Sequence, residues 1–109
     1  MIDFYKYDNQ FVEGKLKKAG LQKRKIVTEE FQIDCWDSEL EKPCIFLING
    51  FGANAEFQWF KQIQILQKDF RVVLINLLYF GNSKPIHKAC YEIQCQVDMI
   101  EALRVALQI

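Results

Sequence analysis

Residues 44–52 read Cys-Ile-Phe-Leu-Ile-Asn-Gly-Phe-Gly, an uninterrupted apolar run that ends in a glycine turn. A second apolar run, Val72–Ile75, opens into a loop that extends from Asn76 to Pro85. Strands that are apolar at every position are typical of parallel sheets covered by helices on both faces. A strand, a helix and a second strand in this order predict a right-handed crossover between parallel neighbours. Loops at the ends of such strands usually carry the chemistry of α/β proteins.

Weaker patterns flank this unit. Asn9–Ala19 has apolar residues at helical spacing and ends at a glycine, which predicts a short amphipathic helix. Two short strands, Lys25–Thr28 and Phe31–Trp36, are predicted to form a hairpin with its turn at Glu29 and Glu30. The order of elements therefore predicts an α/β fold: an N-terminal helix, a β-hairpin, then a parallel strand-helix-strand-helix arrangement.

Two apolar stripes predict the later helices. Residues 55–67 carry the first stripe, at Trp59, Phe60, Ile63 and Leu66. Residues 91–107 carry the second, at Ile93, Val97, Ile100, Leu103 and Leu107. We expect one continuous helix from each stripe, packed against the sheet through these side chains.

Length, charge and composition restrict the class of protein. The chain has 109 residues, enough for at most one small domain, and its 14 basic residues balance 14 acidic ones. This balance favours neither nucleic acid nor an anionic membrane as a partner. No apolar run approaches the roughly 20 residues of a membrane span, and no signal peptide is recognisable, so the cytoplasm is the expected compartment.

Four cysteines and one histidine, His87, have no spacing typical of a zinc site, and no metal or cofactor is expected. We expect all four thiols to be reduced, with Cys44 and Cys95 acting as small apolar side chains.

The turn after the first apolar run has several interpretations. Gly50-Phe51-Gly52-Ala53-Asn54-Ala55 matches the pattern Gly-x-Gly-x-x-Ala of dinucleotide-binding domains. That pattern also requires an acidic residue about 20 positions later, where this chain has Asn76. A second interpretation is structural, because glycines allow a strand to turn tightly into a helix without any ligand.

The third interpretation is a resemblance. From about residue 24 to 109 the chain resembles the N-terminal portion of the α/β-hydrolase fold superfamily, with a glycine turn and a strand-end loop in matching order. The family usually has His-Gly-x-Gly in the first turn and an aspartate that opens the second loop, where this chain has Asn49 and Asn76. This implies two segments: an N-terminal helical segment, 1–23, and a partial hydrolase-like domain, 24–109.

The resemblance also implies a site and an activity. The parent activity is hydrolysis of an ester, an amide or a related small-molecule bond, without a cofactor. The backbone N–H of Phe51 would contribute to the oxyanion hole, with Asn49, Gly50 and Gly52 supporting the turn. Tyr79 and Phe80 are the candidate substrate-pocket residues.

The serine nucleophile, acid and histidine that should follow the last helix are absent from the sequence. Ser83, in Gly81-Asn82-Ser83-Lys84-Pro85, lacks the second glycine of a nucleophile elbow and is interpreted as a turn residue. His87 and Cys90 could form a thiol-imidazole pair only if the fold brought them together.

We therefore expect a truncated gene product, a gene-model fragment or half of a split protein, inactive alone. Two other functions stay open. One is a non-catalytic interaction module that binds itself or a partner chain through the open sheet edge, and the other is a nucleotide-binding domain.

Overall fold

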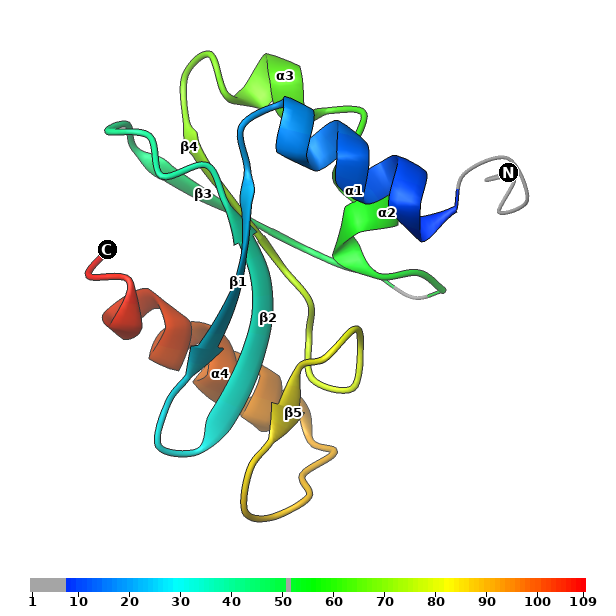
Figure 1. Cartoon of the computed structure of the whole chain (residues 1–109). Helices are drawn as coiled ribbons and strands as arrows, with labels where there is room; N and C mark the ends of the chain where they lie inside the picture. The colour runs from blue at the N-terminus through cyan, green and yellow to red at the C-terminus, as the bar shows by residue number, and fades with distance from the viewer. Residues whose placement is uncertain (1–7, 51) are drawn as a thin grey trace.

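The computed structural model describes residues 8–50 and 52–109. It contains a mixed sheet with helices on both faces (Figure 1). The elements follow in the order α1 (Asn9–Lys18), β1 (Gln22–Val27), β2 (Phe31–Asp37), β3 (Cys44–Ile48), α2 (Ala55–Trp59), α3 (Ile63–Leu66), β4 (Arg71–Ile75), β5 (Lys84–Pro85) and α4 (Ile93–Ala106).

The order of the strands in the sheet is β1-β2-β4-β3, and the short β5 pairs with β2. β1 and β2 form the predicted antiparallel hairpin, and β2 is also antiparallel to β4. β3 and β4 are parallel, with Ile48 opposite Ile75 at their ends. The predicted α/β class and the parallel β3–β4 pair are therefore confirmed. The sequence does not predict β5, since two residues that include a proline leave no strand pattern.

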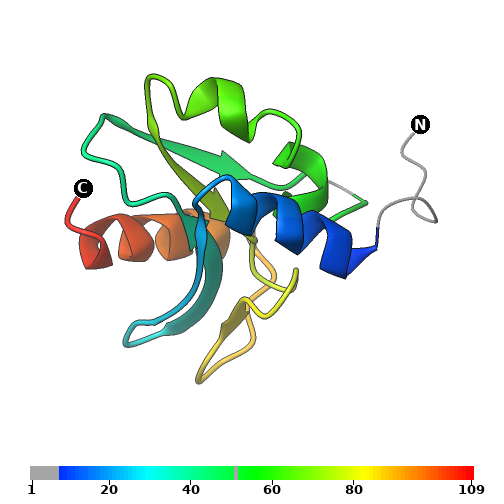
Figure 2. The same ribbon diagram turned by 45° about the horizontal axis from the view of Figure 1, so that its top comes forward.

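Helices cover both faces of this sheet (Figure 2): α1, α2 and α3 lie on one side and α4 on the other. The side chains of β4 point alternately to the two faces of the sheet, so this strand contributes to a core on each side. Val72 and Leu74 pack on the side of α1 to α3, whereas Val73 and Ile75 pack on the side of α4. All four are fully buried, as expected for a central strand.

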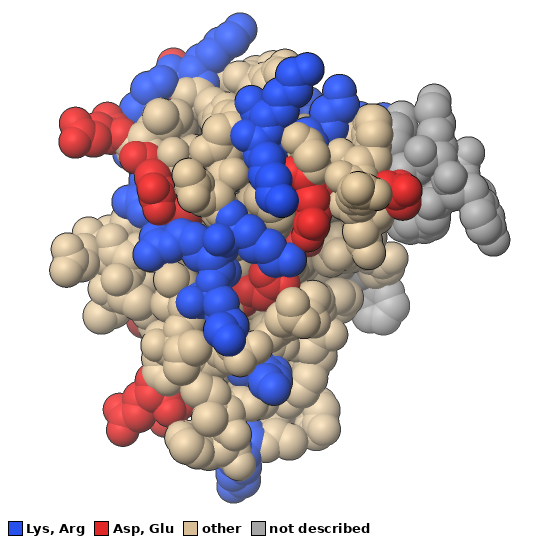
Figure 3. Space-filling model, in the orientation of Figure 1, with Lys and Arg blue, Asp and Glu red and all other residues tan. Residues whose placement is uncertain are grey.

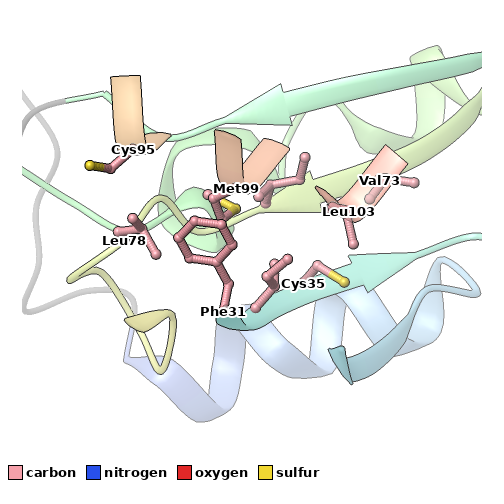
Figure 4. Packing of buried hydrophobic residues seen from close by; sticks show 9 residues of the cluster. Phe31, Cys35, Val73, Leu78, Cys95, Met99 and Leu103 are labelled. Carbon is pink, nitrogen blue, oxygen red and sulfur yellow. The ribbon is translucent and has the colours of Figure 1, made fainter. Parts of the chain in front are cut away.

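The first core joins α1 to the sheet. Its buried members are Leu16, Leu21, Trp36, Leu47, Ala55, Ile63, Val72 and Leu74. The second core lies under α4, and Figure 4 shows most of its side chains between the helix and the sheet. Its buried members are Phe31, Ile33, Cys35, Val73, Ile75, Leu78, Cys95, Met99 and Leu103.

The single helix predicted over 55–67 is wrong, because the chain bends between α2 and α3. Two contacts hold the bend: the Trp59 indole N–H donates to the carbonyl oxygen of Ile48 at 2.8 Å, and Ile63 is fully buried against the sheet. The N–H of Gln62 donates to the carbonyl oxygen of Trp59 at 2.9 Å, three residues back, which is the pattern of a turn. The predicted apolar stripe still packs on the first core.

The helix predicted near the end of the chain is present as α4, but part of its predicted buried face is wrong. Ile93 and Val97 are 82% and 51% exposed. The buried row is Cys95, Met99 and Leu103, at spacings of four, which lie together on one face of a helix. The sequence pattern misses this row because a cysteine and a methionine give it less apolar weight than the two β-branched residues.

The expectation of four reduced thiols is also wrong. Cys90 and Cys95 form a disulfide with their Cα atoms 6.3 Å apart, whereas Cys35 and Cys44 are free. Cys95 lies in the first turn of α4 and Cys90 in the loop just before it. The loop folds back onto the helix, which brings together two cysteines that a longer helix would have separated.

On the face drawn in Figure 3, basic side chains gather in a band over β1 and part of α1, and acidic side chains lie beside this band. Lys23 pairs with Glu13, and Arg24 pairs with Asp37 and Glu39. Among the residues that the structure describes, no helix is long and apolar enough to cross a bilayer.

Candidate functional site

The loops that follow β3 and β4 meet at one edge of the sheet. Asn49 directly follows β3 and Asn76 directly follows β4, and both side chains are almost fully buried. The N–H of Leu77 donates to Asn49 Oδ1 at 2.8 Å, which joins the second loop directly to the first. The arrangement follows from the parallel register, because parallel strands present their carboxyl ends at the same edge.

The glycine turn after β3 is held by a side chain from α2. Gln58 accepts a hydrogen bond from the N–H of Gly50 at 2.7 Å, and its amide donates to the carbonyl oxygens of Gly50 and Ala53. Asn49 Nδ2 also donates to these two carbonyls. Gly52 has φ +99°, a conformation that strains any residue with a Cβ. The predicted oxyanion donor, Phe51, lies outside the described residues.

Asn76 ties this turn to the sheet through a buried polar cluster. Its Oδ1 accepts from the N–H of Ala55 at the start of α2, at 2.8 Å. Its Nδ2 donates to Glu56 at 3.0 Å and to Asp34 at 3.3 Å, and both acids are at least nine-tenths buried. The Trp36 indole N–H donates to the same Glu56 oxygen at 3.0 Å. An amide suits this position, since it offers an acceptor to the helix and donors to the acids.

The loop after Asn76 closes over this cluster. The N–H of Asn82 donates to Asp34 Oδ2 at 3.0 Å, and the N–H of Asp34 donates to the Ser83 hydroxyl at 2.8 Å. A Cβ placed on Gly81 would lie 2.5 Å from Asp34 Oδ2 and 2.8 Å from Asn76 Nδ2. The loop can approach so closely only because residue 81 is a glycine.

Tyr79 and Phe80, the candidate pocket residues, lie in this second loop. Tyr79 has φ +74° and is 46% exposed, and its ring stacks on Tyr91 with centroids 5.1 Å apart. Its hydroxyl donates to the carbonyl oxygen of Cys90 at 2.7 Å and accepts from the N–H of Cys90 at 2.9 Å. Phe80 is partly buried. Tyr79 therefore joins the strand-end loop to the segment that precedes α4.

The two serines have structural contacts. The Ser83 hydroxyl accepts from the N–H of Asp34, and the Ser38 hydroxyl accepts from the N–H of Val72 at 2.9 Å. Both residues are buried. The N–H of Ser83 donates to the carbonyl oxygen of Phe80 at 3.1 Å, three residues back, which agrees with the interpretation of Ser83 as a turn residue. Cys90 is bonded to Cys95, so it is not a free thiol beside His87.

The start of α2 has little capacity for a pyrophosphate. The N–H groups of Ala55 and Phe57 donate to the side chains of Asn76 and Asn54. This geometry favours a structural use of the Gly-x-Gly-x-x-Ala pattern.

Within residues 8–50 and 52–109, no group of three or more histidine, cysteine, aspartate and glutamate side chains is arranged to hold a metal ion.

The sequence identifies the turn but not the side chains that brace it. The helical pattern places Gln58 on the outer face of a helix, and it gives Glu56 and Asp34 no role. Asp34 alternates with the apolar residues Ile33 and Cys35 along β2, a pattern that suggests a solvated face. The only available signal is the pair Asn49 and Asn76, whose amides need partners once buried.

Comparison with known proteins supports this architecture. No family pattern matches the sequence, and no curated protein sequence matches it. Solved structures do match. A bacterial membrane phospholipase A shares 25% identity over 87% of this chain and 31% of its own, with a TM-score of 0.76. A protein of Acinetobacter baumannii AYE assigned as a lipase shares 17% identity over 99% of this chain and 36% of its own, with a TM-score of 0.79.

A Pseudomonas aeruginosa protein assigned as an epoxide hydrolase, solved as a T131D mutant, matches 81% of this chain and 30% of its own, at 19% identity and a TM-score of 0.73. All three have the α/β-hydrolase fold. The chain thus has the fold of part of an α/β-hydrolase, and it spans about a third of the length of these structures.

Proposed function

We propose that this chain is the first part of an α/β-hydrolase that cleaves an ester, an amide or a related bond of a small molecule. The observation that carries the proposal is the hydrogen bond from Leu77 to Asn49, which brings the two strand-end loops together at one edge of the sheet. The structural neighbours named as a phospholipase, a lipase and an epoxide hydrolase support the same class of reaction.

The proposed role of the first turn is to stabilise negative charge. The backbone N–H of Phe51 would donate to the oxyanion that forms when a nucleophile attacks the substrate carbonyl. Gly50, Gly52 and Asn49 would set the path of the backbone, with Gln58 as a brace. Losing one such donor costs about 3 kcal/mol of transition-state stabilisation. Tyr79 and Phe80 would line the substrate pocket.

We propose that these 109 residues do not catalyse the reaction alone, because nucleophile, base and orienting acid act as a unit. Both serine hydroxyls already accept hydrogen bonds from backbone N–H groups. Within this proposal, the chain is one part of a longer or split hydrolase, and its compartment is the cytoplasm.

The test uses p-nitrophenyl acetate and butyrate with the purified chain. We expect equal hydrolysis rates from the wild type, Ser83→Ala and Gly52→Val. Turnover that either substitution abolishes in a folded variant would overturn the proposed inactivity.

The same assay is then applied to the chain extended by any coding sequence that continues the frame beyond Ile109. An extension with a strand and Gly-x-Ser-x-Gly should hydrolyse the esters, and Gly52→Val should lower kcat by about 100-fold. Circular dichroism checks that the variant is folded. An active extended enzyme with unchanged kcat in Gly52→Val would contradict the role of the turn.

A second candidate function, association through the sheet edge, is favoured by one asymmetry. Both β1 and β3 are edge strands among the described elements, but β1 carries Lys23, Arg24 and Lys25, whereas β3 has no charged residue. Charges on an edge strand oppose pairing with another chain. Ile48 is 41% exposed on β3, so this edge is the candidate surface for a second copy.

A further inference from the structure

The cysteine pair joins the loop before α4 to the first turn of that helix. Cys90 is half-buried in the loop before α4, and Cys95 is 8% exposed in the first turn of the helix. Their Cα separation of 6.3 Å lies within the range usual for disulfides. The bond therefore fixes the end of this loop to α4 and closes a short ring of the chain.

The loop before α4, which the disulfide fixes, also makes hydrogen bonds with Tyr79. The tyrosine hydroxyl makes hydrogen bonds with both backbone groups of Cys90, and the ring stacks on Tyr91. Tyr79 belongs to the strand-end loop that follows β4, 11 residues before Cys90. These contacts connect Cys90 directly to that strand-end loop.

The pair also adjoins a hollow in the surface, unlike Cys35, which is fully buried. A hollow of about 600 Å³ is lined by both Cys90 and Cys95, together with Pro85, His87 and Lys88. Cys35 is fully buried in the core under α4 (Figure 4). This burial raises the pKa of its thiol to about 12. Burial also raises the pKa of Cys44. Thiolates are the reactive form, so a raised pKa lowers the reactivity of Cys35 and Cys44 near neutral pH.

We propose that Cys90 and Cys95 form a reversible dithiol–disulfide pair whose redox state sets the order of the Tyr79–Cys90 contact. The inference goes beyond the proposed hydrolase function and does not depend on it. Both cysteines line the hollow, and Cys95 also packs in the core under α4, so exchange at this pair can change the contacts of the helix as well as those of the loop.

The chemistry is thiol–disulfide exchange with a small dithiol. A thiolate of the dithiol attacks Sγ of Cys90, the more exposed of the two residues, and forms a mixed disulfide while Cys95 Sγ leaves as a thiolate. The second thiol of the reagent then displaces Cys90. Two electrons and two protons pass to the protein, and the reagent becomes a cyclic disulfide. Cys95 is a favourable leaving group because the N-terminal turn of a helix stabilises negative charge.

The first measurement counts thiols in the intact chain. We expect native alkylation with iodoacetamide to modify neither Cys90 nor Cys95 in air-oxidised protein, and both after treatment with dithiothreitol. Reoxidation with glutathione disulfide should restore their protection. Cys35 should stay unmodified throughout. Mass spectrometry of the peptides assigns each site, and a pair that stays fully alkylatable after reoxidation would overturn the proposal.

The second measurement follows the structural consequence by amide hydrogen exchange. The Cys90 amide should exchange at least about tenfold faster in the reduced chain, because loop closure no longer restrains it. Cys90→Ser/Cys95→Ser should show the fast rate with or without dithiothreitol. Cys44→Ser is the matched control and should respond like the wild type. Equal exchange in the oxidised and reduced wild type would refute the coupling to Tyr79, even if the double variant failed to fold.

Discussion

Asn76 is the residue on which the candidate site depends most, and its amide is matched to two acids. Asn76→Asp would bring a third carboxylate to within about 3 Å of Glu56 and Asp34. We expect a loss of about 3 kcal/mol in the free energy of unfolding at pH 7. Urea denaturation measures the loss, and Asn76→Asp/Glu56→Gln should recover at least half of it. A wild-type midpoint in Asn76→Asp would show that the cluster does not constrain residue 76.

Two glycines offer a matched comparison. At Gly81, with φ +55°, an alanine Cβ would meet Asp34 and Asn76, so Gly81→Ala should destabilise the fold by about 2 kcal/mol. Gly14 lies inside α1, where an added Cβ would have no atom within 4 Å, and Gly14→Ala should stabilise the fold by about 0.5–1 kcal/mol. Urea midpoints of the two variants should therefore move in opposite directions. A shift of both in the same direction would contradict the close approach at residue 81.

Asp37 gives the fold a pH dependence. Burial would raise the pKa of this fully buried carboxyl, but hydrogen bonds from Arg71 and the N–H of Glu39 outweigh it and hold the pKa below its usual value. Since the folded-state pKa is lower than the unfolded one, the stabilisation is present above the unfolded pKa and is lost as the pH falls through the folded pKa.

Arg71→Met should therefore cost about 2 kcal/mol at pH 7, where it leaves the buried Asp37 carboxylate with only the longer ion pair to Arg24, at 3.5 Å, and less near pH 3. Thermal unfolding across this range measures the difference. Arg104→Met, which breaks an exposed pair with Glu101, is the control and should leave the melting temperature unchanged. An equal loss from Arg71→Met at both pH values would mean that the Asp37 charge does not matter.

At the scale of single elements, the buried face of α4 differs from the face that the sequence pattern predicts. Met99 is fully buried in the core under α4, whereas Ile93 is 82% exposed. Met99→Ala should cost about 3 kcal/mol through lost contacts and a cavity. Ile93→Ala, on the predicted but exposed position, should change the stability by less than about 0.5 kcal/mol. Denaturant midpoints measure both changes in stability. A larger loss of stability from Ile93→Ala than from Met99→Ala would mean that the helix buries the face that periodicity predicts.

Elements whose apolar residues follow one clear pattern could be predicted from the sequence. Elements that depend on contacts between distant residues could not. The hairpin, β3 and β4 follow from apolar runs and turn residues. The bend between α2 and α3 could not be predicted, because it depends on Trp59 reaching the end of β3. The candidate site shows the same division. Asn49 and Gly50 are found from the turn, but Gln58 and Glu56 make their contacts only after the crossover has formed.

At the scale of the whole molecule, the two edges of the sheet differ in charge, and this predicts how copies associate. The β3 edge, Cys44–Ile48, has no charge, and Ile93 and Val97 on α4 add further exposed apolar surface. We expect reversible self-association that strengthens with concentration in sedimentation equilibrium. Ile48→Lys should weaken it at least about tenfold, because a buried ammonium group would oppose strand pairing. Val27→Lys, at an exposed position on the β1 edge, is the matched control and should leave association unchanged. A monomer at all concentrations would exclude the β3 edge as a self-association surface, and an equal effect of the two lysines would assign the association to charge alone.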